Sequence, residues 1–508
     1  MRWLPPTPRI GLYVALNAAF VAAVLMLASI GGAANPRILY LILLFAVCSA
    51  PIIDLDGLNG RFIMPSLYLG FYFVSFGLLD FINLAKGISS ETVSSIFSAT
   101  EGVVLAGSIM MTIGYRVAMA PGKRTPKASP TRDWPINTIL SIGVFWWIIG
   151  TAGTYILDVY IVTDNSIEAS KKGFEIMGPY GTTAFMLATM IQPIGILLIA
   201  YAWRLSRSKL LLALVITVVV VQVLLGFVIN VKSTAMIGGI LVILTFILVE
   251  GGLPIPWLVA AVLYGLFIYP IFVAARAEIH GKGMISRASI LGDLGHVVEL
   301  AIAAENRDNG PGEHSQSMLE RTSVRASMQM IVQRTGVDVK FQDGHTLTPL
   351  LATFVPRIIW SGKPDVATGR VVNKEFRVSE ADFWDTYISP SIPGELYWNF
   401  GWPGVLIGMV VIGGALGTLG QRCNLAERRS VTNLLVVAVT IKQVIVGMEG
   451  TFSPEYVVWF RSLGAIGILH LMFAKVPIPG RTSVNIEQHA SPAQPRLSPL
   501  KPFPNLLN

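Results

Sequence analysis

Two basic residues that directly follow predicted apolar helices have the chemistry to bind a phosphorylated substrate at a membrane surface. Lys232 lies in the segment NVKST and Arg276 in the segment AARAE. A diphosphate held at the depth of lipid headgroups needs fixed cations, and two such residues at one surface would supply them. The alternative is that both are interfacial anchors, because long cationic side chains extend toward the headgroups from helix ends.

A second pair of cations lies in the segment PRIIWSGKP, residues 356–364. Arg357 would contact a phosphate at two points through its planar guanidinium, and Lys363 would add a point charge. Trp360 stands between them and offers an aromatic face on which a sugar ring can stack. An ordinary solvated loop is the alternative.

The segment PGELYWNFG combines a carboxylate with aromatic and amide side chains at the mouth of a predicted span. Glu395 is followed by Tyr397, Trp398 and Asn399. Aromatic faces stack on sugar rings, while amide and carboxylate groups bind hydroxyls, so this composition is typical of a sugar site. The tyrosine and tryptophan also fit an interfacial belt. The glutamate does not, and it is a candidate general base.

Ionisable residues also lie within the last two predicted spans. Lys442 is in the middle of one span, Glu449 and Glu455 lie at the outer turn, and Arg461 is slightly inside the next. Charges at this depth are costly, are usually paired and mark functional sites. A structural ion pair between adjacent helices is the alternative.

The sequence lacks the motifs of several enzyme classes. It contains neither a GxxxxGK[ST] phosphate loop nor an HExxH zinc motif. Four histidines in the longest polar segment lack metal-ligand spacing; they are His280, His296, His314 and His345. We therefore predict no metal site and no cofactor.

These residues must be positioned by membrane helices. The chain has 508 residues, of which 53% are apolar and only 13% are charged, whereas soluble domains have about one quarter charged residues. A bilayer span needs ~20 mostly apolar residues. We predict an all-α, polytopic membrane protein with about twelve transmembrane helices, at 10–30, 37–53, 62–84, 99–120, 136–157, 179–202, 210–230, 234–250, 254–275, 396–419, 431–449 and 456–474.

Positive charge predicts the orientation. One set of connections holds 18 Lys and Arg residues, whereas the opposite short connections hold five. Since Lys and Arg favour the cytoplasmic side, both termini are predicted inside and the long segment 276–395 outside. A D-x-D pattern at Asp54-Leu55-Asp56, which some glycosyltransferases use to hold a metal-bound donor, then falls at an inner turn.

Four regions follow from these spans. Residues 1–275 would hold nine transmembrane helices, 276–395 a large external loop with amphipathic helices, 396–475 three more spans, and 476–508 a disordered cytoplasmic tail. Within the loop, helical patterns cover 288–306 and 316–335, and Gly336 suits the position after a helix end. These helices are expected to cap the membrane bundle.

The net charge of +8 does not predict nucleic-acid binding. The long loop contains 13 Lys and Arg residues against 15 Asp and Glu residues, so the basic excess lies in the predicted inner connections. Topology and anionic lipid explain that excess. The loop contains neither of the two cysteines, so it has no disulfide framework.

The order of these segments resembles that of the bacterial O-antigen polymerase family. Arg325 and Gly336 also fit an R-x10-G spacing found in some polymerase loops. The likeness covers mainly residues 225–415. The matching features, in chain order, are Lys232, Arg276 after Tyr269-Pro270, Gly344-His345-Thr346-Leu347, PRIIWSGKP and GELYWNFGWPG.

This resemblance implies a metal-independent glycosyltransferase of the bacterial inner membrane. Such enzymes polymerise oligosaccharide units carried on undecaprenyl pyrophosphate into the polysaccharide of lipopolysaccharide. It assigns Arg276, Lys232 and Arg357 to the diphosphate, with Lys363 in support. Glu395 would activate the acceptor or bind its hydroxyl, and His345 is a second candidate. Membrane lipid and a chain-length regulator protein are the further partners to consider.

Two other functions remain open. An O-antigen ligase, which transfers glycan to the lipid A core, has similar chemistry. A flippase for lipid-linked oligosaccharides is a transporter, for which short loops and pseudo-symmetric halves are expected. This chain has one dominant loop and no evident internal repeat.

Overall fold

The computed structural model shows an all-helical protein. It describes residues 6–31, 37–54, 60–85, 98–120, 133–156, 167–228, 232–252, 324–348, 368–378, 388–425, 430–445 and 452–474, with a few single positions between them. No strand occurs within these ranges, where one isolated bridge joins Thr335 and Val339. The prediction of an all-α membrane protein is confirmed at this level.

Eight helical segments in the described ranges are long and apolar enough to cross a bilayer. Two shorter apolar helices, Thr234–Glu250 and Val431–Ile445, match two further predicted spans. Helix α6 (Ala99–Ala118) matches a predicted span but is not among the eight. The ninth predicted span, 254–275, lies almost entirely outside the described residues, so the count of twelve stays a prediction.

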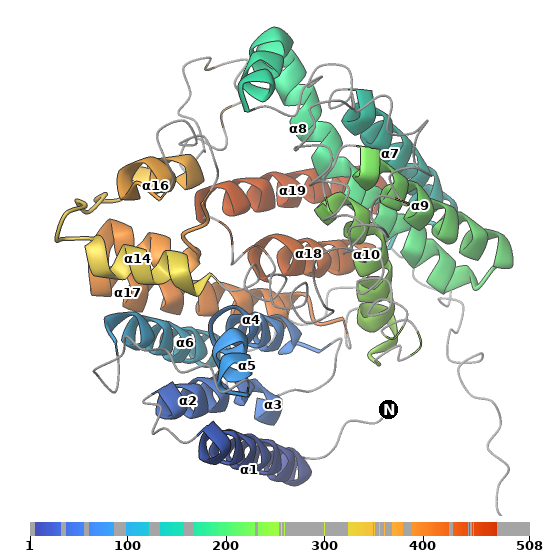
Figure 1. The fold of residues 1–508 in the computed structure, drawn as a ribbon. Helices are drawn as coiled ribbons and strands as arrows, with labels where there is room; N and C mark the ends of the chain where they lie inside the picture. The colour runs from blue at the N-terminus through green and yellow to red at the C-terminus, as the bar shows by residue number, and fades with distance from the viewer. Residues whose placement is uncertain are drawn as a thin grey trace, which may run out of the picture.

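The helices form two groups around a central row. Figure 1 shows α17 (Ile392–Arg422), α18 (Val431–Thr440) and α19 (Phe452–Phe473) in the middle of the molecule. On one side lie α1 (Pro6–Gly31), α2 (Arg37–Ser49), α3 (Pro51–Asp54), α4 (Ile63–Phe73), α5 (Leu79–Ala85) and α6. On the other side lie α7 (Ile136–Ile156), α8 (Ile167–Ser206), α9 (Lys209–Val228) and α10 (Lys232–Glu250).

Glycines allow α6 and α17 to pack more closely than any side chains would permit. A Cβ atom placed on Gly413 would lie 2.1 Å from the carbonyl oxygen of Met111, and one on Gly114 would lie 2.2 Å from that of Val410. Gly413 and Gly417 have the four-residue spacing of close helix contacts in membranes. This contact fixes the middle and C-terminal half of α17 relative to α6.

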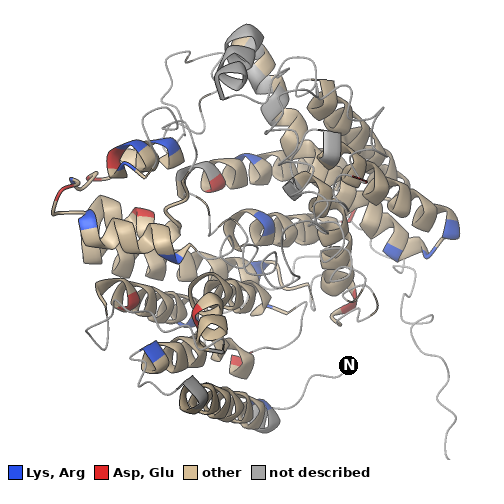
Figure 2. Cartoon of the chain, viewed as in Figure 1, with Lys and Arg blue, Asp and Glu red and all other residues tan. Residues whose placement is uncertain are grey.

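Figure 2 shows many charged residues at helix ends, and basic residues also lie along α19 and the continuation of α18. At one end of the bundle Arg116 pairs with Asp54 at 3.1 Å, and Arg204 pairs with Glu250. The connections predicted to be cytoplasmic hold Arg116 and Arg204. Asp54 belongs to the D-x-D pattern, and its carboxylate also accepts a hydrogen bond from Tyr115. This gives Asp54 a structural role.

The opposite end carries the described part of the long loop. Helix α14 (Arg325–Arg334) and helix α16 (Thr368–Phe376) lie beside the start of α17. Buried apolar side chains join them in a small second core, which consists of Ile331, Val339, Val372, Phe376 and Trp398. The predicted helix at 316–335 is thus observed from Arg325 onward. The predicted helix at 288–306 lies outside the described residues, as does the tail from Lys475.

Candidate functional site at the start of helix α17

A break in α17 creates the backbone acceptors on which the site is built. Gly401 has φ 63° and ψ −147°, a conformation that is almost confined to glycine. Pro403 follows and has no N–H group to donate to the carbonyl oxygen of Asn399. The carbonyl oxygens of Trp398 and Asn399 are therefore available to another part of the chain.

A turn of the long loop binds these two carbonyl oxygens. The backbone N–H of Gln342 donates to Trp398 at 3.0 Å, and that of Asp343 donates to Asn399 at 3.2 Å. Gly344, at φ 86°, then starts the short 3-10 helix η3 (His345–Leu347). Through this docking, the segment Gly344–Leu347 and the segment Glu395–Phe400, which are separate in sequence, become neighbours.

Glu395 lies at the centre of this junction and is fully buried. Its Oε1 atom accepts a hydrogen bond from the Thr346 hydroxyl at 2.8 Å. Its Oε2 atom accepts one from the backbone N–H of Phe452, the first residue of α19, at 2.6 Å. The carboxylate thus connects the loop turn, α17 and α19. It also lies at the N-terminus of α19, where the positive end of the helix dipole stabilises a negative charge.

Asn399 completes the hydrogen-bond network. Its Nδ2 atom donates to Thr346 Oγ1 at 2.7 Å and to the carbonyl oxygen of Glu395 at 2.8 Å. These two acceptors fix the orientation of the amide, which leaves Oδ1 as a buried acceptor with no partner among the described residues. A buried acceptor of this kind can receive a hydrogen bond from a hydroxyl group.

The aromatic residues near Glu395 are placed differently from what stacking on a sugar requires. Trp398 is fully buried and packs against Phe376, with ring centroids 5.3 Å apart. Tyr397 is half-buried and packs edge-to-face on Trp402. The predicted sugar-stacking role of Trp398 does not fit this position, because both faces of its ring lie in the protein interior. Asn399 is buried as well, but its Oδ1 keeps a hydrogen-bonding role open.

His345 and Trp360 are exposed. His345 begins η3, next to Thr346, while its side chain lies at the surface. Trp360 is 44% exposed. Neither has a described contact to Glu395, so their predicted roles stay predictions.

Several predicted cations lie outside what the structure describes. They include Arg276, Arg357 and Lys363, and the acidic Glu449, predicted as an intramembrane charge, also lies outside the described residues. Lys232 is the first residue of α10, but its side chain is not described either. The diphosphate site assigned to these cations is therefore not tested.

The charges that were predicted to lie in the membrane are on the continuation of α18 and on α19. Lys442 belongs to the π-helical segment η5 (Ile441–Ile445), and it interacts electrostatically with Glu455 of α19. The structural ion pair that the sequence offered as an alternative stays a prediction. Arg461 is half-buried in α19.

Sequence reasoning missed a second cluster of charges at the same end of the bundle. Arg325 of α14 pairs with Asp80 of α5 and with Glu101 of α6, and Arg37 of α2 pairs with the same two carboxylates. Arg37, Asp80 and Arg325 are far apart in sequence. The only available signal was that all four residues lie on the predicted outer side.

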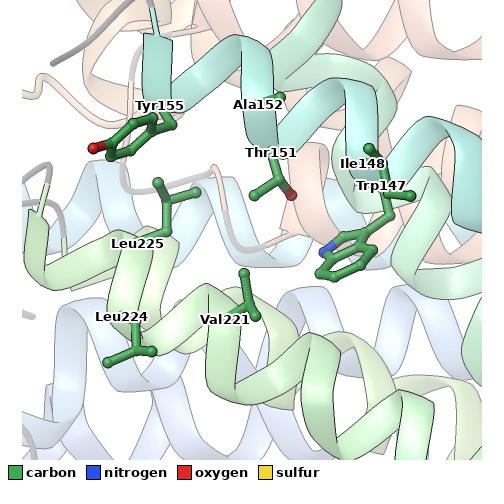
Figure 3. A pocket seen from close by; sticks show the side chains of 8 residues that line it. All are labelled: Trp147, Ile148, Thr151, Ala152, Tyr155, Val221, Leu224 and Leu225. Atoms are coloured by element: carbon green, nitrogen blue, oxygen red, sulfur yellow. The ribbon is translucent and has the colours of Figure 1, made fainter.

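An open apolar groove of about 380 Å³ lies elsewhere, between α7 and α9. Figure 3 shows the rings of Trp147 and Tyr155 along α7, opposite Val221, Leu224 and Leu225 of α9. Its lining shares no residue with the Glu395 network. Among the described residues there is no group of three or more His, Cys, Asp or Glu side chains that could hold a metal ion.

Comparison with known proteins does not identify the chain. No protein-family model, no curated protein and no solved structure matches it. The chemistry of the site therefore rests on its own residues: a carboxylate that can accept a proton, a hydroxyl and an amide that orient it, and a buried acceptor beside it.

Proposed function

We propose that this protein polymerises oligosaccharide units carried on undecaprenyl pyrophosphate, at the periplasmic face of the bacterial inner membrane. The proposal begins from the sequence resemblance to O-antigen polymerases. The observation that carries it further is the hydrogen bond between Thr346 and Glu395. This bond joins two of the segments on which the resemblance depends, across 49 residues, around a buried carboxylate.

The position of Glu395 before a stretch of α17 that is long enough to cross a bilayer also supports the proposal. From Trp402 to Arg422 the helix is long enough to cross ~30 Å of hydrocarbon at a rise of ~1.5 Å per residue. Glu395 precedes this stretch by about two helical turns, or ~10 Å. A lipid-linked diphosphate and its first sugar would lie at that level.

In the proposed reaction, a hydroxyl oxygen of the acceptor unit attacks the C1 atom of the sugar on the lipid diphosphate. The C1–O bond to the diphosphate breaks, and the diphosphate leaves with the electron pair. Glu395 takes the proton of the attacking hydroxyl. The cations that sequence assigns to the diphosphate would stabilise its developing charge.

Glu395 would have to become accessible for this step. Its two oxygens already accept hydrogen bonds from Thr346 and Phe452. Movement of the η3 turn would release Oε1 and open the site from the loop side. The acceptor hydroxyl would then take the place of the Thr346 hydroxyl beside Asn399.

A transporter is the second candidate, and one observation favours it. Lys442, which is predicted to lie within a span, interacts electrostatically with Glu455 at the predicted outer turn, and Lys442 lies in a π-helical segment. Paired intramembrane charges mark ion or substrate pathways, and π-helical segments often occur at functional sites.

Deletion of the gene in its native host, followed by electrophoresis of the lipopolysaccharide, separates these functions. We expect lipid A core with a single repeat unit and no ladder of longer chains. Bare core together with periplasmic lipid-linked glycan would instead indicate a ligase. Bare core with these intermediates confined to the cytoplasmic side would indicate a flippase.

Complementation with Glu395→Ala tests the site itself. We expect no long chains from this variant at an unchanged protein level in the membrane. Glu375→Ala is the matched control, because Glu375 is an exposed glutamate of α16, and it should restore the ladder. A normal ladder from Glu395→Ala would refute the assignment of Glu395.

A further inference from the structure

A buried cluster of two arginines and two carboxylates joins the long loop to the membrane helices. Arg325 lies 2.6 Å from Glu101 and also contacts Asp80 directly. Arg37 lies 3.4 Å from Asp80 and 3.6 Å from Glu101. The side chains of Asp80 and Glu101 are only 5% and 1% exposed. The charges balance, which is the condition under which buried ions are tolerated.

Local structure fixes the carboxylate that faces Arg325. Glu101 forms a capping box with Ser98 at the start of α6, in which Oε2 accepts the Ser98 N–H at 2.8 Å. Its other oxygen, Oε1, therefore points to Arg325 in one orientation. Arg325 also lies over the ring of Tyr40, with its Cζ atom 5.6 Å from the centroid. Burial lowers the pKa of Arg325 to about 10, so the group is still charged at neutral pH.

Helix α14 connects the charge cluster at Arg325 to the Glu395 site through a series of contacts. Arg325 is its first residue, and Met328, one turn on, accepts a hydrogen bond from the hydroxyl of Ser391, the N-cap residue of α17. Gly336 follows the C-terminal end of α14 at φ 83°. The chain then turns back through Phe341, which packs beside Gly401, and reaches the η3 turn.

We propose that Arg325 is a positioning residue that fixes α14, and with it the turn that binds Glu395, to the ends of α5 and α6. The guanidinium of Arg325 pairs with two carboxylates of the protein itself. An arginine that binds a substrate phosphate would instead direct its guanidinium to the ligand. The R-x10-G spacing then runs from Arg325, the first residue of α14, to Gly336, the glycine that follows the end of this helix. Only the consequence for catalysis rests on the proposed function.

Maleimide labelling of a buried reporter cysteine measures the docking directly. The reporter is Met328→Cys, in a protein whose Cys48 and Cys423 are replaced by alanine. Met328 is fully buried, so labelling of the full-length protein in detergent should be slow. Arg325→Met should increase the labelling rate at least about tenfold, because it leaves a buried carboxylate unpaired. Lys340→Ala, which removes an exposed cation of the same segment, should not change it.

The double variant Arg325→Met/Asp80→Asn distinguishes positioning from substrate binding. It restores charge balance, with Arg37 and Glu101 still paired, so labelling should return to within about threefold of the reporter protein. Long glycan chains, lost in the single variant, should return with it. A substrate-binding arginine would not be rescued by a change at Asp80.

Two results would overturn the proposal: unchanged labelling in Arg325→Met, or failure of the double variant to restore slow labelling. If Arg325→Met does not fold, Glu101→Gln weakens the same pairing and should raise labelling by a smaller factor. An unchanged labelling rate in Glu101→Gln would also contradict the positioning role of Arg325. Absence of polymer even with the wild-type chain would instead refute the proposed function and leave the labelling result valid.

Discussion

The carboxylate of Glu395 binds groups that come from 49 residues earlier and 57 residues later in the chain. At the scale of the residue, its position is determined by Thr346 and by the N–H of Phe452. Thr346 has two functions in this network, since its hydroxyl donates to Glu395 and accepts from Asn399. Loss of that hydroxyl affects two buried groups at once.

We predict that Thr346→Val lowers the free energy of unfolding by ~1–3 kcal/mol, because a buried carboxylate oxygen and a buried amide lose their partner. Thermal unfolding of the purified protein in detergent measures the loss. Thr348→Val is the control, since Thr348 is exposed and its hydroxyl donates to the nearby carbonyl oxygen of His345. It should change stability by less than ~0.5 kcal/mol. Equal effects of the two variants would contradict the network.

At the scale of the element, the break in α17 organises the site. A continuous helix would use the carbonyl oxygens of Trp398 and Asn399 internally. The non-helical Gly401 and the missing N–H of Pro403 release these oxygens to Gln342 and Asp343. The same break separates the part of α17 that carries Glu395 from residues 402–422, which are long enough by themselves to cross a bilayer.

Gly401→Ala is expected to destabilise the protein by ~1–3 kcal/mol, because alanine strongly disfavours the backbone conformation at this position. Amide hydrogen exchange at Gln342 and Asp343 should become faster, since their acceptors move. Gly239→Ala in α10 is the matched control, because its added methyl group meets no atom within 4 Å in a regular helix. It should be neutral or stabilise by up to ~1 kcal/mol. Unchanged amide exchange in Gly401→Ala would show that the turn docks on α17 without needing the break at Gly401.

The contact of α6 with α17 gives a second prediction at this scale. Gly413→Ala places a methyl group against the carbonyl oxygen of Met111, so the helices must separate. We expect a loss of ~1–3 kcal/mol or more, the range for overpacked interiors. Thermal unfolding measures it, with Gly464→Ala as the control in open space on α19. A stable Gly413→Ala protein would show that this contact tolerates a wider spacing.

At the scale of the whole molecule, the two ends of the bundle carry different charge clusters. Arg37, Asp80, Glu101 and Arg325 meet at one end, whereas Asp54 pairs with Arg116 at the other. Connections that the charge count placed on the same side of the membrane therefore meet at the same end. This agreement supports one consistent topology and leaves its direction to experiment.

Cysteine labelling in intact cells tests that direction. Val337 is 83% exposed at the α14 end, and Lys209 is exposed at the start of α9. In a protein without native cysteines, Val337→Cys should react with an impermeant maleimide in cells whose outer membrane is permeable to it. Lys209→Cys should react only after the inner membrane is opened. The reverse pattern would place Glu395 on the cytoplasmic side and refute the proposed periplasmic reaction.

The sequence by itself determined the class of fold and the position of most helices. Apolar stretches long enough for a bilayer need no tertiary contact to be recognised, so α1, α7 and α9 match the predicted spans closely. The sequence also singled out Glu395, since a carboxylate at the mouth of a span is costly and has no simple structural explanation. Its partners were not foreseeable, because Thr346 and Phe452 are brought to it by chain folding.

Only the tertiary structure decided which polar residues face the protein and which face a ligand. Trp398 is a residue type that often stacks on sugars, but the packing of α14 and α16 against α17 buries its ring. Arg325 is a residue type that binds phosphate, but its guanidinium pairs with two carboxylates from other helices. Local sequence gives a side chain its chemistry, whereas burial and pairing depend on contacts between distant segments, which no local pattern encodes.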